Sequence, residues 1–427
     1  MKNSFIYKLT SIICVFALVL TVFVGCLDGD SKNAVYPAAY GSYGADFARE
    51  LAESYPFRKA FTEQEREAGE MIKSELEELG LTVEVQSFTN AEGASSQNYI
   101  VNIPGQGFLA VDDDGNYNTI KKTIVIGAHY DSFFAQEEIP EGYTYDGIDD
   151  NASGVGCLMT IASQISNYNN LGFDVELVFF GAGSIQAGSI YYYNSLTNAE
   201  TSSVECMFCI DGIYAGDKLY ANAGLNSLDL SQKYQMRRKL YQVYDVVYDN
   251  PLYSGYEFSL YYNECGIIAD LNGDGIEDVY REVSIRVSDH TVFDNAGVPV
   301  VYFDSYDYFF DEISKMKETK NLNLQEFGGQ VGGTLIDSST VLDPIFVTTT
   351  DGLQITDAEG ETLSATSEPT VVDRLQVRIN CLAYSILETL EKGSDYGITF
   401  EEYDALMQQT SNRVTTTPSD DEDEVEG

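Results

Sequence analysis

The chain has 427 residues, of which 44% are hydrophobic and 22% are charged. This composition is typical of a globular protein, because a disordered acidic chain has too few apolar residues to build a core. The 68 acidic residues outnumber the 24 basic ones, and the formal net charge is −44. This charge argues against nucleic acid and anionic lipid surfaces as direct partners, since both are bound through Lys and Arg.

The N-terminus has the layout of a secretory signal peptide. Two lysines in residues 1–8 precede an almost unbroken apolar stretch over residues 9–25, which is short for a membrane span. Its end, Phe23-Val24-Gly25-Cys26, resembles the lipobox of bacterial lipoproteins, in which the cysteine is lipidated. We expect a lipoprotein signal peptide over 1–25, a lipid on Cys26, a tether over 26–40 and a folded part outside the cytoplasmic membrane. An uncleaved N-terminal anchor is the alternative.

Helical and strand patterns alternate along the rest of the chain. Apolar residues at three-to-four spacing predict helices, and short alternating or continuous apolar runs predict strands. Strands joined through helices favour right-handed crossovers, so the pattern predicts an α/β fold: one large domain with a mainly parallel central sheet flanked by helices on both faces. The predicted helices are 45–55, 62–79, 154–168, 189–196 and 371–390, and the predicted strands are 81–88, 98–103, 122–128, 175–180, 204–211 and 298–303.

This domain is expected to occupy residues 41–398. Residues 260–285 read as an insertion, and the Gly-, Thr- and Ser-rich residues 320–368 as an irregular insertion. Residues 399–427 are expected to form an acidic, partly disordered tail.

The cysteines do not predict a disulfide framework, because an odd number remains once Cys14 and Cys26 are set aside. Cys206 and Cys209 have the spacing of a redox pair. They lie in an apolar strand-like run, however, and core packing is the preferred interpretation.

Both histidines of the chain lie in polar segments that follow apolar ones. His129 directly follows a predicted buried strand, and His290 lies in Ser288-Asp289-His290. Asp150 and Asp211 lie in similar places, and the carboxyl ends of parallel strands are where ligands gather in open α/β sheets. Imidazole and carboxylate are ordinary zinc ligands. The alternative is two unremarkable histidines among the loop aspartates of an Asp-rich chain.

The segments Gly127-Ala-His129-Tyr-Asp131-Ser132 and Asp150-Asn-Ala-Ser-Gly154 resemble metallopeptidase family 28. These are aminopeptidase-like zinc exopeptidases that include bacterial leucyl aminopeptidases, and the resemblance extends over about residues 45–304. It implies a zinc-exopeptidase fold in which two metal ions share a bridging aspartate, matching Asp150. One metal adds His129 and Asp211, and the other adds His290 and a glutamate. Asp131 matches the carboxylate that orients the first histidine.

The chain departs from this family after the strand over 175–180. The family has Gly-Ala-Glu-Glu, in which the first glutamate is the general base and the second is a metal ligand, whereas this chain has Gly181-Ala182-Gly183-Ser184. The general base is therefore absent, with Gly183 and Ser184 in its place. The first metal keeps three ligands and an open position, which suits catalytic zinc, and the second metal should be weak or absent. Asp146, Asp149 or the loop acids Glu137, Glu138 and Glu141 are candidate substitute bases, although loop carboxylates are usually just solvated.

A second acidic motif, Asp270 to Asp278, has the spacing of a calcium loop. Its oxygen ligands would be Asp270, Asn272, Asp274, the carbonyl of Ile276 and Asp278. Position 12 is Arg281, so the motif is not an EF-hand. A plain acidic turn is the alternative to a structural calcium site.

Two functions follow from these observations. The first is a lipid-anchored extracytoplasmic zinc peptidase that removes N-terminal residues from peptide or protein substrates, weakened by the loss of the glutamate pair. The second is an inactive pseudopeptidase that acts as a binding or scaffold module at the cell surface, as transferrin receptor ectodomains do in the same superfamily. The fold favours neither, since function resides in the site.

Overall fold

The computed structural model describes residues 36–415 apart from 135–138, 169, 230, 265–267, 271–272, 309–314, 351–353, 357–361 and 366–369. The expected signal peptide, Cys26 and residues 416–427 lie outside this part of the chain. None of the helices in the described part is long and apolar enough to cross a membrane.

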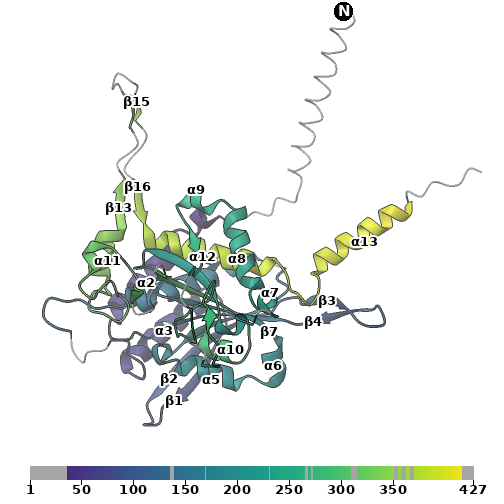
Figure 1. The fold of residues 1–427 in the computed structure, drawn as a ribbon, viewed down its shortest axis with the longest axis horizontal. Helices are drawn as coiled ribbons and strands as arrows, with labels where there is room; N and C mark the ends of the chain where they lie inside the picture. Colours follow the sequence, from purple (N-terminus) through teal and green to yellow (C-terminus); the bar gives the residue numbers. More distant parts are fainter. Residues whose placement is uncertain are drawn as a thin grey trace, which may run out of the picture. The chain divides into compact units, whose positions relative to one another are not determined.

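A central sheet of eight strands organises the chain from Tyr40 onward (Figure 1). Strands β6, β5, β7 and β12 are parallel neighbours, β1 and β2 add antiparallel to one side, and β8 adds antiparallel to the other, followed by a short parallel β9. The predicted α/β class with a mainly parallel sheet is confirmed. In spatial order the strands are β1 (Val83–Thr89), β2 (Ser95–Ile103), β6 (Asp174–Phe180), β5 (Thr123–His129), β7 (Val204–Asp211), β12 (Val300–Tyr306), β8 (Lys218–Ala223) and β9 (Leu260–Tyr261).

Helices cover both faces of this sheet. On one face α2 (Tyr43–Ser54), α4 (Gly154–Gln164) and α12 (Arg374–Glu391) pack on one another, and α4 contacts β5, β6 and β7. On the other face α5 (Ala187–Ser195) and α10 (Thr291–Asn295) pack together over an apolar cluster that includes Val125, Met207 and Val300. The central strands are buried on both sides, which explains their continuous apolar sequences.

The helix predicted over residues 62–79 is confirmed, and capping residues mark both of its ends. α3 (Glu63–Glu78) begins after Thr62, whose hydroxyl accepts a hydrogen bond from the Glu65 amide, and Gly80 follows its end with φ +82°. For the helix predicted over residues 371–390, the predicted start is wrong. Residues 370–373 form a strand, and α12 begins at Arg374 because the Asp373 carboxylate accepts the amides of Leu375 and Gln376.

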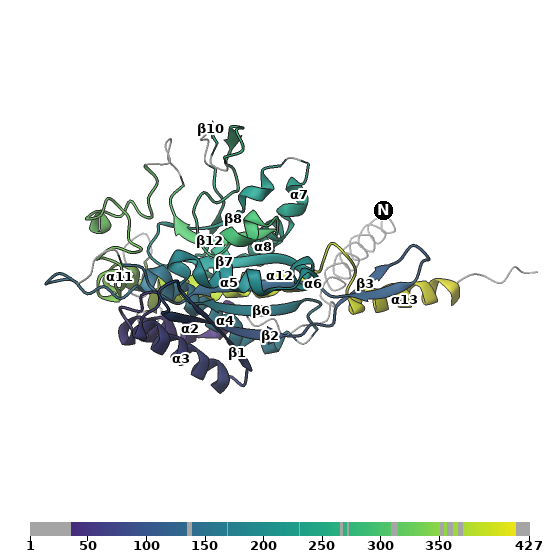
Figure 2. The same ribbon diagram turned by 90° about the horizontal axis from the view of Figure 1, so that it is seen from below.

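The segment 320–368 is more regular than its composition predicts. It contains α11 (Ser339–Phe346) and β13 (Val347–Thr350), which pairs with β16 (Thr370–Asp373) in an antiparallel ribbon. Within the predicted tail, residues 400–415 form a helix, α13, which lies beside the β3–β4 hairpin in both views (Figure 2).

The other elements are β3 (Phe108–Val111), β4 (Tyr117–Ile120), α6 (Asn198–Ser203), α7 (Lys233–Met236), α8 (Arg238–Asp249), α9 (Leu252–Tyr256), β10 (Ile268–Ala269), β11 (Asp278–Val279), β14 (Gln354–Thr356), β15 (Thr362–Ala365) and α13 (Phe400–Thr415).

The cysteines described by the structure are buried and unpaired. Cys206 and Cys209 lie on β7 within the core, and burial raises the pKa of both thiols. Core packing is therefore confirmed for this pair, and the redox interpretation has no support.

Candidate metal centre

Three of the predicted zinc ligands meet at the carboxyl end of the parallel strands. His129 is the last residue of β5, Asp211 is the last residue of β7, and Asp150 lies in the turn Ile148–Ser153 that leads into α4. The His129 Nε2 atom is 3.2 Å from Asp150 Oδ1 and 3.5 Å from Asp211 Oδ1. One ligand atom from each residue lies within 4.8 Å of the other two.

These separations fit a tetrahedral zinc ion. Zinc bonds of about 2.0–2.2 Å place neighbouring ligand atoms about 3.3–3.6 Å apart, which matches the distances from His129 Nε2. All three groups are also at least three-quarters buried, so their charges would be costly without a compensating cation. The donor set and its spacing therefore suit one zinc ion held by His129, Asp150 and Asp211.

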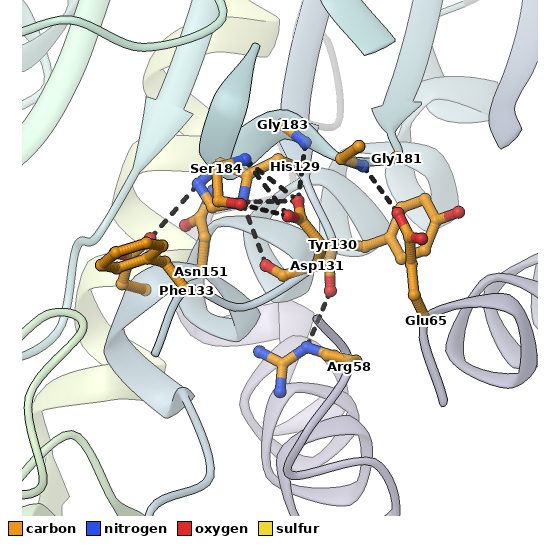
Figure 3. A network of polar contacts seen from close by, with 12 residues as sticks. Arg58, Glu65, His129, Tyr130, Asp131, Phe133, Asn151, Gly181, Gly183 and Ser184 are labelled. Carbon is orange, nitrogen blue, oxygen red and sulfur yellow. Dashed lines mark hydrogen bonds and ion pairs between the residues drawn. The ribbon is translucent and has the colours of Figure 1, made fainter. Parts of the chain in front are cut away.

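Asp131 fixes the orientation of His129, as the resemblance implies. The His129 Nδ1 atom lies 3.3 Å from Asp131 Oδ1 and 3.1 Å from the Asp131 carbonyl oxygen. The carboxylate itself accepts hydrogen bonds from the Gly183 amide (2.7 Å) and from the Ser184 hydroxyl (2.5 Å), as Figure 3 shows. A carboxylate beside Nδ1 keeps Nε2 directed at the metal position and makes the imidazole a stronger ligand.

The charges of this cluster act on one another strongly. Burial alone would lower the pKa of His129, but its contacts with Asp131, Asp150 and Asp211 raise that pKa well above the ordinary value. Burial would likewise raise the pKa of Asp211, yet the hydrogen bond from His129 and the charges of His129 and Arg286 lower it. A cation between these groups is therefore favourable, whether it is a proton on the imidazole or a metal ion.

Two residues hold the loop that carries Asp150. The Asp337 carboxylate accepts hydrogen bonds from the amides of Asp149 (2.8 Å) and Asp150 (3.2 Å). The buried Arg58 guanidinium donates to the carbonyl of Tyr130 (2.7 Å), as Figure 3 shows, and to that of Gly147 (2.6 Å), so it ties this loop to the end of β5. The geometry of the ligands is thus set by contacts between segments that are distant in sequence.

The turn that replaces the family's glutamate pair lies directly against His129. A Cβ atom on Gly183 would lie 2.1 Å from the His129 Cβ, so the His129 side chain already fills the space at this position. Ser184 directs its hydroxyl at Asp131, and its amide also donates to that carboxylate. A carboxylate side chain is absent here, and at position 183 it would have no room.

Glu65 supports this turn from the far side. Its carboxylate accepts hydrogen bonds from the amides of Ala182 (2.6 Å) and Phe61 (2.5 Å) and from the Ser96 hydroxyl (2.7 Å). Burial and the nearby charge of Asp131 raise the pKa of Glu65 to about 8. Glu65 therefore anchors the Gly183–Ser184 turn and stays out of the metal cluster.

His290, the fourth predicted ligand, does not belong to this cluster of three. The group of ligand atoms within 4.8 Å of one another, among the described residues, contains His129, Asp150 and Asp211 alone. The His290 ring packs on Tyr302 with centroids 4.3 Å apart, and the Tyr302 hydroxyl donates to Asp211 Oδ2 (3.0 Å). Burial lowers the pKa of His290 to about 4, and its Nδ1 atom has no hydrogen-bond partner. His290 is thus a neutral imidazole beside an incomplete second site.

The candidate substitute bases do not fill the gap left by the glutamates. The Asp149 carboxylate accepts the amides of Tyr214 and Ala215, both at 2.8 Å, and the Asp146 carboxylate accepts those of Ile148 (3.1 Å) and Ser339 (2.9 Å). Both therefore hold the backbone of their loops. Glu141 is exposed, and Glu137 and Glu138 lie outside the described residues.

The predicted calcium loop is described only in part, because Asn272 lies outside the described residues. The Asp270 carboxylate accepts the amides of Gly273 (2.8 Å) and Gly275 (3.0 Å), and Asp274 accepts that of Ile276 (2.8 Å). These hydrogen bonds form a tight exposed turn and leave the calcium assignment a prediction.

Asp337, Glu65 and Arg286 were not identified from the sequence. Each is a single charged residue outside the quoted motifs, and Asp337 lies in the segment read as irregular. Arg58 belongs to the resembling segments, but only the structure shows the carbonyls to which it donates.

Comparisons with known proteins agree with this architecture. Residues 112–260 match the model of Peptidase family M28. A relative from Escherichia coli (strain K12), the alkaline phosphatase isozyme conversion protein, is 21% identical over 272 residues, covering 61% of this chain and 71% of the relative.

One solved structure shows the same fold at low sequence identity, and a second is similar to a lesser degree. A glutaminyl cyclase from an Acidobacteriales bacterium superposes with a TM-score of 0.50 at 15% identity, covering 83% of this chain and 96% of that one. BSAP, a zinc aminopeptidase from Bacillus subtilis, gives a TM-score of 0.48 at 12% identity, and the alignment covers 84% of this chain and 98% of the BSAP chain.

Proposed function

We propose that this protein, which has the fold of the family 28 metallopeptidases, is a single-zinc peptidase that removes N-terminal residues slowly. The observation that carries the proposal is the placement of His129 Nε2, Asp150 Oδ1 and Asp211 Oδ1 at zinc-ligand spacing. Beside them lies a turn with no carboxylate, which accounts for the reduced rate.

A zinc ion at this position would polarise a scissile carbonyl and make a bound water more acidic. The chain's own residues hold the ligands for it. Asp131 orients His129, Tyr302 donates to Asp211, and Asp337 holds the backbone of Asp150. What the chain does not provide is a proton acceptor at Gly183 or Ser184. A general base typically contributes about 10²–10⁴-fold, so we expect turnover reduced by this order relative to peptidases that keep the glutamate.

The second candidate function is an inactive module that binds peptides. It is favoured by the same turn, because Gly183 packs on His129 and Ser184 is committed to Asp131. In this case the cluster would hold zinc as a structural or ligand-binding ion and would hydrolyse nothing.

The proposal includes location. The signal-like residues 1–25 and Cys26 support a lipid-anchored protein on the outer side of the cytoplasmic membrane. There the strongly negative net charge of the chain would attract divalent cations and the amino groups of peptides. Palmitate labelling of the expressed full chain tests this, with loss of label in Cys26→Ala as the expected result. A label that persists in that variant contradicts lipidation at Cys26.

Activity assays separate the two functions. The zinc-loaded protein is incubated with a panel of aminoacyl chromogenic substrates and one N-terminal glutaminyl peptide, because a glutaminyl cyclase shares the fold. Cleavage that Asp150→Ala abolishes supports the peptidase. Zinc binding without turnover of any substrate supports the binding module, and turnover that survives in Asp150→Ala comes from a contaminant and contradicts the peptidase.

We further propose a structural calcium ion at the Asp270 loop, supported by the spacing of Asp270, Asp274 and Asp278. Thermal melting with millimolar calcium and with a chelator tests it. A higher midpoint with calcium, lost in Asp274→Asn, is expected, and an unchanged midpoint contradicts the site.

A further inference from the structure

A cavity of about 400 Å³ lies away from the metal cluster, where α9, α11 and the start of α12 meet. Aromatic side chains form much of its wall, among them Tyr253, Phe258 and Phe346. Arg374 and Arg378 also line it, one helical turn apart on α12. Small-molecule sites typically measure about 300–1,000 Å³ and combine apolar walls with a few polar groups, so this cavity has the size and lining of such a site.

Arg374 has no polar partner in the described part of the chain. Its guanidinium lies 3.6 Å from the centre of the Phe346 ring, and its Nη1 atom is buried without a hydrogen bond. Stacking on the ring holds the guanidinium plane in place but leaves its N–H groups unsatisfied. A buried donor without an acceptor is costly, which makes this atom a position where an acceptor is expected.

Arg378 adds a second positive charge, and among the described residues no carboxylate lies within ion-pair distance of it, although the charges of Asp149 and Asp217 act on it from further away. It is buried, and its guanidinium donates to the carbonyls of Ile213 (3.0 Å), Tyr214 (3.0 Å) and Asp217 (3.3 Å). Burial and the charge of Arg374 lower the pKa of Arg378 to about 9, and burial also lowers the pKa of Arg374. The two cations therefore destabilise each other across the cavity wall.

The acidic residues of the wall do not form ion pairs with this arginine pair. Asp217 directs its carboxylate at the Thr319 hydroxyl (2.6 Å) and the Lys320 amide (2.7 Å), and Glu257 is exposed. Elsewhere a partly buried arginine has its counter-charge: Arg49 pairs with Asp343 (2.9 Å) and Asp373 (2.8 Å).

We propose that this cavity binds a small-molecule oxyanion, a carboxylate or a phosphate monoester carried on an aromatic or apolar group, with Arg374 as its main cation and Arg378 beside it. The planar guanidinium fork matches the two oxygens of either anion. The aromatic wall then packs on the rest of the ligand, because the cavity is larger than an oxyanion alone.

Binding of three probes to the zinc-loaded full chain tests this assignment. Phenyl phosphate, benzoate and inorganic phosphate are titrated by calorimetry at constant ionic strength. At least one of the two aromatic probes is expected to bind at least tenfold more tightly than inorganic phosphate, and the preferred one identifies the anion. Absence of binding by all three probes up to 10 mM overturns the proposal.

Variants locate the binding. Arg374→Gln is expected to weaken the preferred probe at least tenfold, whereas Arg281→Gln, an equal charge change on an exposed residue, leaves it within twofold. Asp150→Ala, which removes a zinc ligand, should retain the probe, so this result is independent of the peptidase proposal. Loss of binding in Asp150→Ala alone would place the probe at the metal and overturn the assignment.

A structural role for Arg374 gives a different result. If stacking on Phe346 were its purpose, Arg374→Gln would lower the melting temperature in chloride buffer and leave probe binding unchanged. The oxyanion site predicts the reverse, namely a melting temperature that is equal or higher, because an unpaired buried charge is removed, together with loss of the probe.

Discussion

The two sides of the metal centre differ in how completely their polar groups are paired. On the side of His129, Asp150 and Asp211, each ligand has a partner that orients it. Asp131 lies beside the His129 imidazole, the Asp337 carboxylate accepts the amide of Asp150, and the Tyr302 hydroxyl donates to Asp211. On the side of His290, the imidazole Nδ1 and both oxygens of Asp289 are buried without hydrogen bonds. The contrast shows that protein contacts orient the polar groups on the His129 side, whereas these groups on the His290 side have no such contacts.

The turn at Gly183 explains the difference between the two sides. A Cβ atom at this position would lie 2.1 Å from the His129 Cβ and 2.8 Å from Asp289 Oδ2, so these two side chains leave no room for a side chain at 183. Burial raises the pKa of Asp289 to about 7, so this carboxyl is partly protonated near neutral pH. A neutral or poorly directed carboxyl cannot replace the missing glutamate as a ligand.

The largest expected effect comes from removing one of the three ligands His129, Asp150 and Asp211. Asp211→Ala leaves His129 and Asp150 as a two-ligand site, and we expect the zinc affinity to fall by more than about 100-fold, beyond the 10–100-fold typical of supporting residues. Competition with a fluorescent zinc chelator measures it. Asp112→Ala on the exposed β3–β4 turn is the matched control, and unchanged affinity in Asp211→Ala contradicts the assignment of this ligand.

The next effect concerns the residue that orients His129. Asp131→Asn keeps the shape but loses the charge that faces Nδ1 and that accepts three hydrogen bonds from Gly183 and Ser184. Zinc affinity should fall about 10–100-fold, with less effect on folding than Asp131→Ala. Ser184→Ala removes one hydrogen bond and should change affinity less. Equal affinity in Asp131→Asn and the unmodified protein would show that His129 needs no orienting carboxylate.

A smaller effect is expected from filling the turn itself. Gly183→Ala places a methyl group 2.1 Å from the His129 Cβ and should destabilise the fold by about 1–3 kcal/mol, the usual range for overpacking. Gly255→Ala is the matched control, because a Cβ there has nothing within 4 Å. Urea unfolding of the two variants measures the difference. Equal stability would mean that the turn moves freely and that room for a side chain exists.

The smallest effect is a pH dependence from Glu65. Its folded pKa of about 8 lies above the ordinary value, so the folded state binds more protons than the unfolded state between these values. The stability that this group contributes is present below the unfolded pKa of about 4.3 and is lost as the pH rises through about 8. Melting temperature should therefore fall over this range, and less steeply in Glu65→Gln. Glu67→Gln, exposed on the same helix, should retain the slope, and an unchanged slope in Glu65→Gln contradicts the shift.

The sequence predicts the three zinc ligands better than it predicts the residues that hold them in place. β7 spans the predicted residues 204–211, because a strand buried on both faces is a continuous apolar run. The ligands His129 and Asp211 could be predicted since each lies at the end of such a strand, and Asp150 could be predicted since it lies in a specific motif directly before a predicted helix. Their convergence depends on parallel strands ending at one edge of the sheet, which the alternating pattern already implies.

The supporting contacts could not be predicted, because they join distant segments without a local pattern. Asp337 reaches the Asp150 loop from a segment read as irregular, and one aspartate among many acidic residues carries no signal. The absence of the glutamates at 183 and 184 is visible in the sequence. That the His129 side chain leaves no room for a side chain at position 183 is visible only in the structure.

Zinc content in a pair of histidine variants tests the central claim most directly. The purified full chain, His129→Ala and His290→Ala are loaded with zinc, freed of excess metal and analysed by mass spectrometry. We predict about one zinc per chain in the unmodified protein and in His290→Ala, and none in His129→Ala. Two zinc ions per chain, or loss of zinc in His290→Ala together with its retention in His129→Ala, would contradict a single site at His129, Asp150 and Asp211.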